Sequence, residues 1–439
     1  MNVNYLHLMC VLVFMAYSFR MGLKTAVVNF IYIAPFYSIS LIDLPWSAYI
    51  KPPEVYAAGL AVLFIAKRGS LKSAPLIFAL LFFIPFLISL VLNVYHFNPI
   101  DAWEIDAEKR EVFYEKLTTR REITSTNFTQ LLYIIAALVV FVVSASVDMA
   151  SKREHIGAAL GKSAALISII GLFQIVAYYY NFYGVYLWMF YNSAASNFSE
   201  LAWNEIGGIK RINSTFSEPS IFGLYIGLYM LVALILGGWR VDYLLKRPSF
   251  WVALFAGMIS LSGTFYFCLF TLAGFYLAHK YRGMTGIALC LCCILVVVAA
   301  ASWLPSLFLF EPSTFFDQKK ASFIERYYFG LELPLKNISI NPFWGAALGS
   351  DRPTTLIFNL LVSVGFVGFF IAIVAVSFIW RRGVKDIIYF WMLCGMLSPD
   401  LNFIFIWLYI GIVYSALSGA GIGVESVRNV SARIKTSAR

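Results

Sequence analysis

The chain has 439 residues, of which 61% are hydrophobic, 18% are aromatic and only 13% are charged. A water-soluble globular domain carries about 25% charged residues, so this composition excludes a soluble protein and indicates a polytopic membrane protein. The formal charge of +10 does not predict nucleic-acid binding, because the basic residues gather in short segments between apolar runs and report membrane topology instead.

Apolar runs recur from Leu6 to Leu417 without a long polar module, so we expect one all-α polytopic transmembrane domain over residues 1–439. About 12 to 14 transmembrane helices fit these runs, and about 13 fit best. The predicted spans lie near residues 3–19, 25–42, 54–66, 74–92, 128–147, 164–190, 219–238, 249–262, 264–279, 285–304, 356–380, 386–398 and 403–418.

The run from Ser249 to His279 is too long for one ordinary span. Treating it as a single crossing would move the basic residues after span 356–380 away from the other basic loops. We therefore expect a break near Ser262-Gly263-Thr264 and two short helices, an arrangement that membranes tolerate where the broken backbone faces protein or water.

The distribution of lysine and arginine predicts the orientation of the chain. One set of alternate loops, with the C-terminal tail, holds 20 basic residues against five acidic ones, whereas the other side holds 13 basic and 18 acidic residues. The first side is predicted to be cytoplasmic and the second extracytoplasmic. Residues Met1 to Asn4 offer no basic region before the first apolar run, so we expect a retained first span with an outer N-terminus and a cytoplasmic C-terminus.

The six cysteines all lie inside apolar runs. Cys290, Cys292 and Cys293 form a cluster, but packing on a lipid-embedded helix explains it more simply than metal binding. The sequence therefore predicts no metal site, no cofactor and no disulfide framework.

Two long outer loops are predicted in the first half of the chain. The first periplasmic loop, residues 93–127, carries mixed charges at helical spacing between Asp101 and Leu117, which predicts a solvated surface helix or, alternatively, a docking site for a partner. The second, residues 191–218, follows an aromatic cluster from Tyr178 to Trp188. Such a cluster is typical of a membrane interface, and sugar stacking by one or two of its rings is the alternative.

The second loop ends in Arg211-Ile-Asn-Ser-Thr-Phe-Ser-Glu-Pro-Ser220, directly before an apolar run. Pro219 suits the first turn of a helix, and Ser217 or Glu218 stands where an N-cap is expected. Helix capping thus explains the Ser-Glu-Pro-Ser part, but it leaves Arg211 unexplained. A chain that keeps charge out of its hydrophobic stretches and then places polar groups at a membrane boundary is expected to have its active site there.

The third and largest outer loop spans residues 305–355. Its segment 323–334 is predicted to form a short amphipathic helix, and a loop of this length without a function is uncommon. The turn Asn341-Pro-Phe-Trp-Gly345 follows, and Gly365-Phe-Val-Gly368 lies within the next span.

In this order and placement, the Arg211 to Ser220 motif, Arg326 in the large loop, Asn-Pro-x-x-Gly and Gly-x-x-Gly resemble the Wzy family of O-antigen and capsule polymerases, within the larger group that includes O-antigen ligases. The ligases resemble each other in a His followed by Asn, Ser or Gln, nine further residues and Gly-x-x-Gly. Thr354 and Thr355 stand at those places here, which favours a polymerase over a ligase.

The resemblance implies a GT-C-like membrane fold with long extracytoplasmic loops in the bacterial inner membrane. It further implies metal-independent polymerisation of undecaprenyl-diphosphate-linked oligosaccharide repeat units at the periplasmic face. The implied partners are membrane lipid and a polysaccharide co-polymerase that regulates chain length, with no nucleic acid. An O-antigen ligase-like glycosyltransferase, a lipid or polysaccharide transporter and a membrane scaffold remain open as alternatives.

Such a reaction defines the residues expected at its site. A diphosphate leaving group gains negative charge, which guanidinium groups stabilise in bidentate fashion. We therefore expect Arg211 and Arg326 to be catalytic, with Glu218 as the base that takes the acceptor proton. The residues expected to bind substrate are Lys210, Ser217, Ser220, Tyr327 and Arg352.

Overall fold

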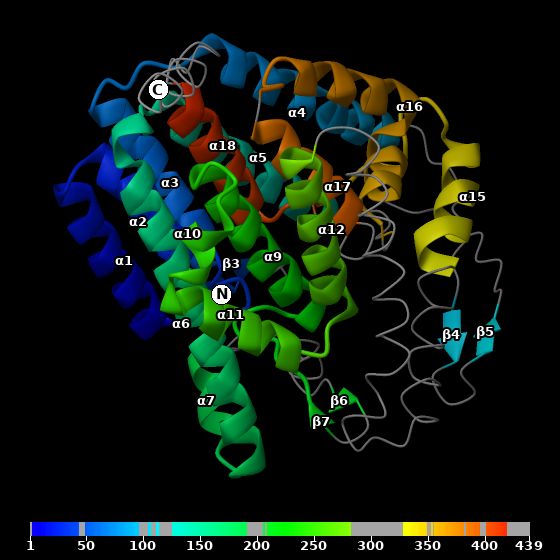
Figure 1. The fold of residues 1–439 in the computed structure, drawn as a ribbon. Coiled ribbons are helices and arrows are strands. Elements are labelled where there is room, and N and C mark those ends of the chain that lie inside the picture. Colours follow the sequence, from blue (N-terminus) through cyan, green and yellow to red (C-terminus); the bar gives the residue numbers. More distant parts are fainter. Residues whose placement is uncertain are drawn as a thin grey trace.

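The protein is described by a computed structural model that covers residues 2–43, 49–95, 104–106, 111–113, 125–190, 205–206, 209–281, 328–348, 353, 355–381, 383–395 and 401–418. The described chain is mostly helical (Figure 1). Every predicted span overlaps at least one helix, except 285–304, which lies outside the described residues.

The helices at the predicted spans are α1 (Tyr5–Arg20), α2 (Leu23–Ile33), α3 (Pro52–Ala66), α4 (Ser73–Tyr95), α5 (Ser125–Ser146), α6 (Arg153–Tyr179), α7 (Tyr183–Phe190), α9 (Pro219–Leu236), α11 (Pro248–Ile259), α12 (Gly263–Lys280), α16 (Leu356–Ser377), α17 (Val384–Cys394) and α18 (Ile404–Ser418). Shorter connecting pieces are η1 (Ala150–Lys152), α10 (Val241–Leu245), η2 (Tyr328–Glu332) and α15 (Leu333–Ile340). In the described residues, α4, α5, α6 with η1, α9 and α16 supply segments long and apolar enough to cross a membrane. Shorter apolar helices accompany them, so the all-α membrane character is supported.

Two predicted spans differ from the helices found. The span 25–42 ends as helix at Ile33, because Pro35 has no N–H with which to continue the helical hydrogen bonds beyond Ala34. The span 164–190 is two helices, since Asn181 between α6 and α7 takes a left-handed conformation with φ 61°. Asparagine is among the few residues that adopt this conformation readily.

Three small groups of strands join the helices. β1 (Asn2–Val3), β2 (Ile42–Asp43) and β3 (Tyr49–Ile50) form an antiparallel sheet, and the other pairs are β4 (Glu104–Asp106) with β5 (Glu111–Phe113) and β6 (Glu205–Ile206) with β7 (Ile209–Lys210). The helix predicted within residues 101–117 is therefore wrong for the part described. Ile105 stands opposite Val112 in the β4–β5 pair, and β-branched residues favour such cross-strand pairing over a helix.

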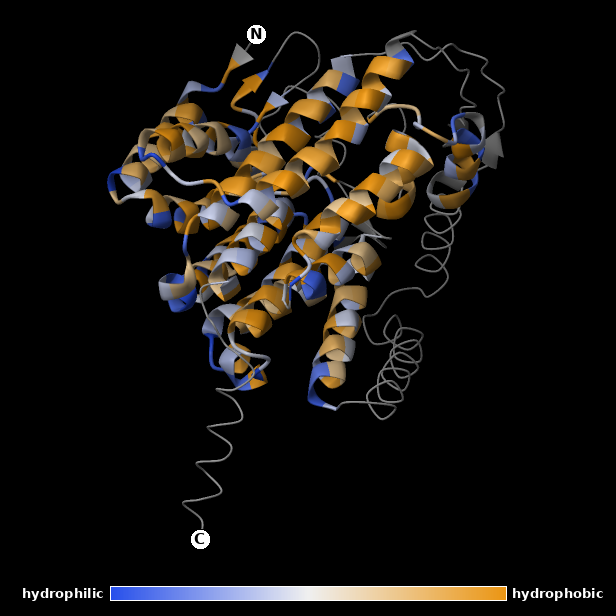
Figure 2. Cartoon of the chain, turned by 90° about the horizontal axis from the view of Figure 1, so that it is seen from above, coloured by the Kyte–Doolittle hydropathy of each residue, from blue (hydrophilic) through white to orange (hydrophobic). Residues whose placement is uncertain are grey.

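The helix α9 lies at the centre of the bundle (Figure 1). All of its residues from Pro219 to Leu236 are buried, and it packs against α6, α12, α17 and α18. A helix that is apolar on every side is expected in such a core position. Figure 2 shows hydrophobic residues along the lengths of the surrounding helices and hydrophilic residues concentrated near their ends.

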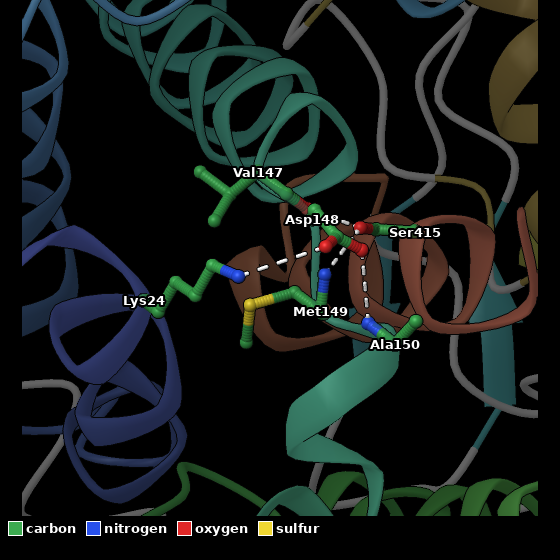
Figure 3. A network of polar contacts seen from close by, with 6 residues as sticks. All are labelled: Lys24, Val147, Asp148, Met149, Ala150 and Ser415. Carbon is green, nitrogen blue, oxygen red and sulfur yellow. Dashed lines mark hydrogen bonds and ion pairs between the residues drawn. The ribbon is translucent and has the colours of Figure 1, made fainter. Parts of the chain in front are cut away.

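Predicted cytoplasmic residues meet at one end of the bundle (Figure 3). Lys24 Nζ lies 3.6 Å from Asp148 Oδ2, and Asp148 Oδ1 accepts a hydrogen bond of 3.2 Å from the backbone N–H of Ala150. Ser415 Oγ, near the end of α18, accepts a hydrogen bond of 3.1 Å from the N–H of Met149. The ends of α5 and α18 and the start of α2 therefore share one face.

Predicted outer segments meet at the opposite end of the same helices. The N–H of Ser38 donates to the carbonyl oxygen of Thr215 at 2.9 Å, and Tyr133 Oη donates to the carbonyl oxygen of Tyr49 at 2.6 Å. The alternation of loops that the basic residues predict is thus consistent with the packing.

The predicted break in residues 249–279 is confirmed. α11 ends at Ile259 and α12 begins at Gly263, with Leu261 left-handed at φ 49° in the turn between them. α12 then runs parallel to α9 at close range: a Cβ built on Gly223 would lie 2.8 Å from the backbone nitrogen of Phe265. The N-termini of α9 and α12 consequently lie side by side.

Candidate active site

The motif from Arg211 to Ser220 links β7 to α9 as a buried, tightly bonded segment. Residues 212–216 are fully buried, and Ser214 is left-handed at φ 56°. Gln174 Oε1, near the C-terminal end of α6, accepts hydrogen bonds from the N–H groups of Asn213 at 2.9 Å and Ser214 at 3.1 Å. One buried amide side chain thus fixes the turn that precedes the central helix.

The hydroxyl groups in the middle of the motif also bond to backbone. Ser214 Oγ donates to the carbonyl oxygen of Ile167 at 2.5 Å, and Thr215 Oγ1 donates to that of Pro35 at 2.7 Å. The carbonyl oxygen of Ser214 accepts a hydrogen bond from Tyr186 Oη. These contacts tie the segment to α6, α7 and the end of α2, so its central residues hold the segment in place.

Arg211 is half-buried and lies at the turn between α11 and α12. Its Nη2 donates to the carbonyl oxygen of Leu261 at 3.3 Å, and its Nε makes a longer bond of 3.5 Å to that of Ser260. A guanidinium is favoured there because carbonyl groups at a helix C-terminus carry partial negative charge. These bonds hold the positive charge beside the N-terminus of α12.

Glu218 occupies the N-cap position of α9 with extended backbone, and Pro219 follows in the first turn, as the sequence predicts. Within the described residues, however, the Glu218 side chain makes no capping hydrogen bond. The side chain is exposed, and its Oε2 accepts a hydrogen bond of 2.8 Å from Ser220 Oγ. The carboxylate is therefore held by Ser220 at the surface of the helix start, where it can accept a proton.

Ser217 and Lys210 flank these groups in different surroundings. Ser217 is half-buried, and its carbonyl oxygen accepts a hydrogen bond of 3.1 Å from Asn213 Nδ2. Lys210 is fully buried; its N–H donates to Tyr179 Oη at 3.2 Å and its Nζ lies 5.8 Å from the centre of the Tyr183 ring. This lysine contacts an aromatic ring in the way that stabilises a buried cation.

The aromatic cluster is divided between core and surface. Tyr183 and Tyr186 are buried and stacked, with ring centres 5.4 Å apart. Tyr180 and Trp188, in contrast, are exposed over 75% and 58% of their surface. Only the exposed members fit the predicted membrane-interface belt, and the buried pair supports the motif.

Three predicted site residues, Arg326, Tyr327 and Arg352, lie outside the described residues. The other five predicted site residues lie at one end of the bundle: Lys210, Arg211, Ser217, Glu218 and Ser220. That Arg211 and Arg326 lie close together stays a prediction, because Arg326 is outside the described residues.

The Asn-Pro-x-x-Gly turn and the Gly-x-x-Gly segment of α16 pack against each other, and we call this contact the glycine joint. α16 is interrupted at Gly365, which is left-handed at φ 64°, and the turn after Asn341 packs into the interruption. The N–H of Phe366 donates to the carbonyl oxygen of Pro342 at 2.7 Å, and that of Val367 donates to the carbonyl oxygen of Phe343 at 3.1 Å. Hydrogen bonds that an unbroken helix would make internally are thus made to the turn.

The carbonyl groups freed by the break also find partners. The carbonyl oxygen of Val362 accepts the N–H of Ala346 at 2.7 Å, and that of Ser363 accepts Ser89 Oγ of α4 at 2.7 Å. Ser89 Oγ in turn accepts the N–H of Ala347 at 3.1 Å. Buried backbone groups need such partners, and one serine of α4 supplies two of them.

Sequence reasoning did not single out Gln174 or Ser89. The available signal for Gln174 is a lone amide within a long apolar helix, because a buried polar group inside a membrane span needs a partner. Ser89 offers no comparable signal, since a serine in such a helix can bond to its own backbone.

The geometry favours an anionic substrate beside a carboxylate. Arg211 stands near the start of α12, the start of α9 lies alongside, and the positive ends of two helix dipoles add to the field of the guanidinium. The Glu218 side chain is exposed at the same end of the bundle.

Comparison of the chain with protein-family models, with curated proteins and with solved structures found no match in any of the three.

Proposed function

We propose that the protein polymerises undecaprenyl-diphosphate-linked oligosaccharide repeat units into a surface polysaccharide, an O-antigen, capsule or exopolysaccharide, on the periplasmic side of the bacterial inner membrane. A GT-C-like arrangement of about 13 spans belongs to this proposal. The observation that supports it best is the placement of a fixed guanidinium beside the start of α12 and of an exposed carboxylate at the neighbouring start of α9.

The reaction is a single glycosyl transfer. A hydroxyl oxygen of the acceptor unit forms a bond to the anomeric carbon of the donor chain, while the bond from that carbon to the diphosphate oxygen breaks. The electron pair leaves with undecaprenyl diphosphate, and the hydroxyl proton passes to the Glu218 carboxylate. General-base assistance of this kind typically contributes about 10² to 10⁴ in rate.

Arg211 stabilises the charge that develops on the leaving diphosphate. Its bonds to the α11–α12 turn fix the guanidinium before substrate arrives, so little reorganisation is needed during reaction. In this proposal Arg326 and Arg352 complete the anion site from the large loop. The positive charge of Lys210 stabilises the bound diphosphate through its electrostatic field and not by direct contact, because the ammonium is buried against Tyr183.

Hydroxyl groups complete the proposed site. Ser220 donates to Glu218 Oε2, which orients the carboxylate and leaves its other oxygen for the acceptor hydroxyl. Ser217 and Tyr327 are assigned to sugar or phosphate oxygens.

A reconstituted assay with purified lipid-linked repeat unit tests the proposal. We expect wild-type protein to produce a ladder of polymers and Arg211→Lys to leave mostly single units, because a lysine cannot reproduce the bidentate contact. Long chains of normal distribution from Arg211→Lys would remove Arg211 from the mechanism, and no polymer from wild-type protein and substrate would refute the proposed activity.

A further inference from the structure

A buried lysine lies beside the motif without belonging to it. Lys51, at the start of α3, is only 6% exposed, and its Nζ stands 3.3 Å from the ring centre of Tyr37 and 5.0 Å from that of Tyr133. Its backbone N–H donates to Glu54 Oε2 at 3.0 Å, which caps the start of α3.

Two amide side chains bond to each other at residues that adjoin the aromatic neighbours of this lysine. Asn402, just before α18, is 5% exposed, and its Nδ2 donates to Gln130 Oε1 on α5. Asn402 Oδ1 is buried and has no hydrogen-bond partner within the described part of the chain. A buried carbonyl without a partner is costly, and a native protein rarely leaves one without a reason.

Aromatic contacts bring the amides and the lysine together. Gln130 lies one turn before Tyr133 on α5, and Phe403, next to Asn402, meets the Tyr37 ring edge-to-face with centres 5.3 Å apart. We call Tyr37, Lys51, Gln130, Tyr133, Asn402 and Phe403 the Lys51–Asn402 cluster. Gln130 and Tyr133 are half-exposed, so these two members of the cluster reach the surface.

The cluster and the motif share one structural element. The segment from Pro35 to Ser38 accepts the Thr215 hydroxyl at its start and donates a backbone hydrogen bond to the Thr215 carbonyl oxygen at its end. Tyr37 lies between these two contacts and carries Lys51 on its ring. A ligand on the cluster would therefore lie beside the chain segment that carries Arg211 and Glu218.

We propose that the Lys51–Asn402 cluster binds a sugar ring of the oligosaccharide, and that this sugar belongs to the acceptor unit; the second part rests on the proposed function. Tyrosine rings combine an apolar face with a polar edge, which suits the apolar face and the hydroxyl rim of a pyranose. Planar amides and an ammonium add directed hydrogen bonds in a mostly apolar setting, as in small-molecule sites generally.

The Asn402 carbonyl oxygen, which has no partner in the described part of the chain, distinguishes a sugar ligand from an anionic one. Asn402 Oδ1 needs a hydrogen-bond donor, whereas a diphosphate at neutral pH offers mainly acceptors. A sugar hydroxyl can donate to this oxygen and can also accept a hydrogen bond from a neighbouring donor. The cluster is therefore assigned to the sugar portion of the substrate and not to its diphosphate.

The test measures binding without catalysis. Full-length protein in detergent is titrated with the repeat-unit oligosaccharide released from its lipid by mild acid, and affinity is followed by saturation-transfer NMR. We expect wild-type protein to bind and Asn402→Ala and Gln130→Leu each to weaken binding by at least about tenfold, because site polar groups lose their partners. Asn29→Ala is the matched control, since that amide bonds only to Ser18 in the described contacts and lies outside the cluster.

The outcomes distinguish this inference from the proposed function. Wild-type affinity in both Asn402→Ala and Gln130→Leu, or no binding by wild-type protein, overturns the inference; if Asn402→Ala does not fold, Gln130→Leu decides alone. Displacement of the oligosaccharide by inorganic diphosphate would show an anion site and would also overturn it. Weakened sugar binding together with a failed polymerisation assay would uphold the cluster as a sugar site and refute only the activity.

Discussion

The carbonyl group of Phe343 occupies the space that a side chain at Gly365 would need: a Cβ built there would lie 2.3 Å from the Phe343 carbonyl carbon. The left-handed backbone of Gly365 adds a second reason for glycine. The turn after Asn341 therefore fits into the break in α16, and the break in turn requires glycine at position 365.

Replacement of Gly365 by alanine should destabilise the protein by about 2 kcal/mol or more, because strain and overlap act together. Thermal unfolding in detergent, followed by intrinsic fluorescence, measures the effect. Gly184→Ala in α7 is the control, since a Cβ there meets nothing within 4 Å. Equal melting temperatures for Gly365→Ala and wild type would contradict the described joint.

Ser89→Ala should cost about 1–3 kcal/mol, since the carbonyl of Ser363 and the N–H of Ala347 both lose their partner. The same unfolding assay applies. Ser377→Ala is a matched control, because that serine is exposed and bonds only to the carbonyl of its own helix at Val374 in the described contacts. A loss no greater than that of Ser377→Ala would show that Ser89 is dispensable to the joint.

Gln174→Met should loosen the motif while preserving side-chain volume. The N–H groups of Asn213 and Ser214 lose their shared acceptor, which should remove about 1.4 kcal/mol or more of protection against hydrogen exchange. Their hydrogen exchange should therefore become faster by about tenfold or more. Exchange mass spectrometry of peptides covering residues 211–217 measures this, with peptides from α18 as the internal reference. Unchanged exchange in the motif would remove Gln174 as its support.

Glu218→Gln should lower the rate of polymerisation by about 10² to 10⁴ without altering the fold. The amide keeps the size of the side chain and an oxygen for the Ser220 hydroxyl, but it cannot take the acceptor proton. Turnover of lipid-linked repeat unit and the melting temperature should be measured together. A fully active Glu218→Gln would assign the residue to the helix start alone.

Cysteine labelling in intact cells tests the predicted orientation. In a background without the six native cysteines, Glu218→Cys should react with a membrane-impermeant thiol reagent, because Glu218 is exposed at the predicted outer end. Asp148→Cys, exposed at the other end, should react only after the inner membrane is opened. The reverse pattern would place the motif in the cytosol and exclude the proposed chemistry.

Hydropathy and charge predicted the apolar helices and a break near Ser262, because both depend on local composition. The position of Glu218 before Pro219 at the start of α9 was predicted for the same reason. The helix expected between Asp101 and Leu117 was wrong where the chain is described, since mixed charges at helical spacing do not outweigh the pairing of Ile105 with Val112.

The contacts that hold the candidate site could not be read in this way. Gln174 lies some forty residues before the amides it accepts, and Ser89 lies more than 250 residues before Ala347. Such bonds depend on which helices become neighbours, which composition does not specify. The same holds for Lys51, whose place between the rings of Tyr37 and Tyr133 follows from the packing of α3 against α2 and α5.

The short helix α11 has a consequence for the surrounding lipid. Its twelve residues extend about 18 Å, whereas the hydrocarbon layer of a typical bilayer is about 30 Å thick. If α11 spans the bilayer, its two ends cannot both reach the headgroups of an undeformed membrane. Protein covers part of the turn at its C-terminal end, since Ser260 and Ser262 are buried, and thinner lipid or water beside α11 would cover the rest. Arg211 is bonded to one of those ends, and the mismatch would thus give a charged headgroup a shortened path to it from the side.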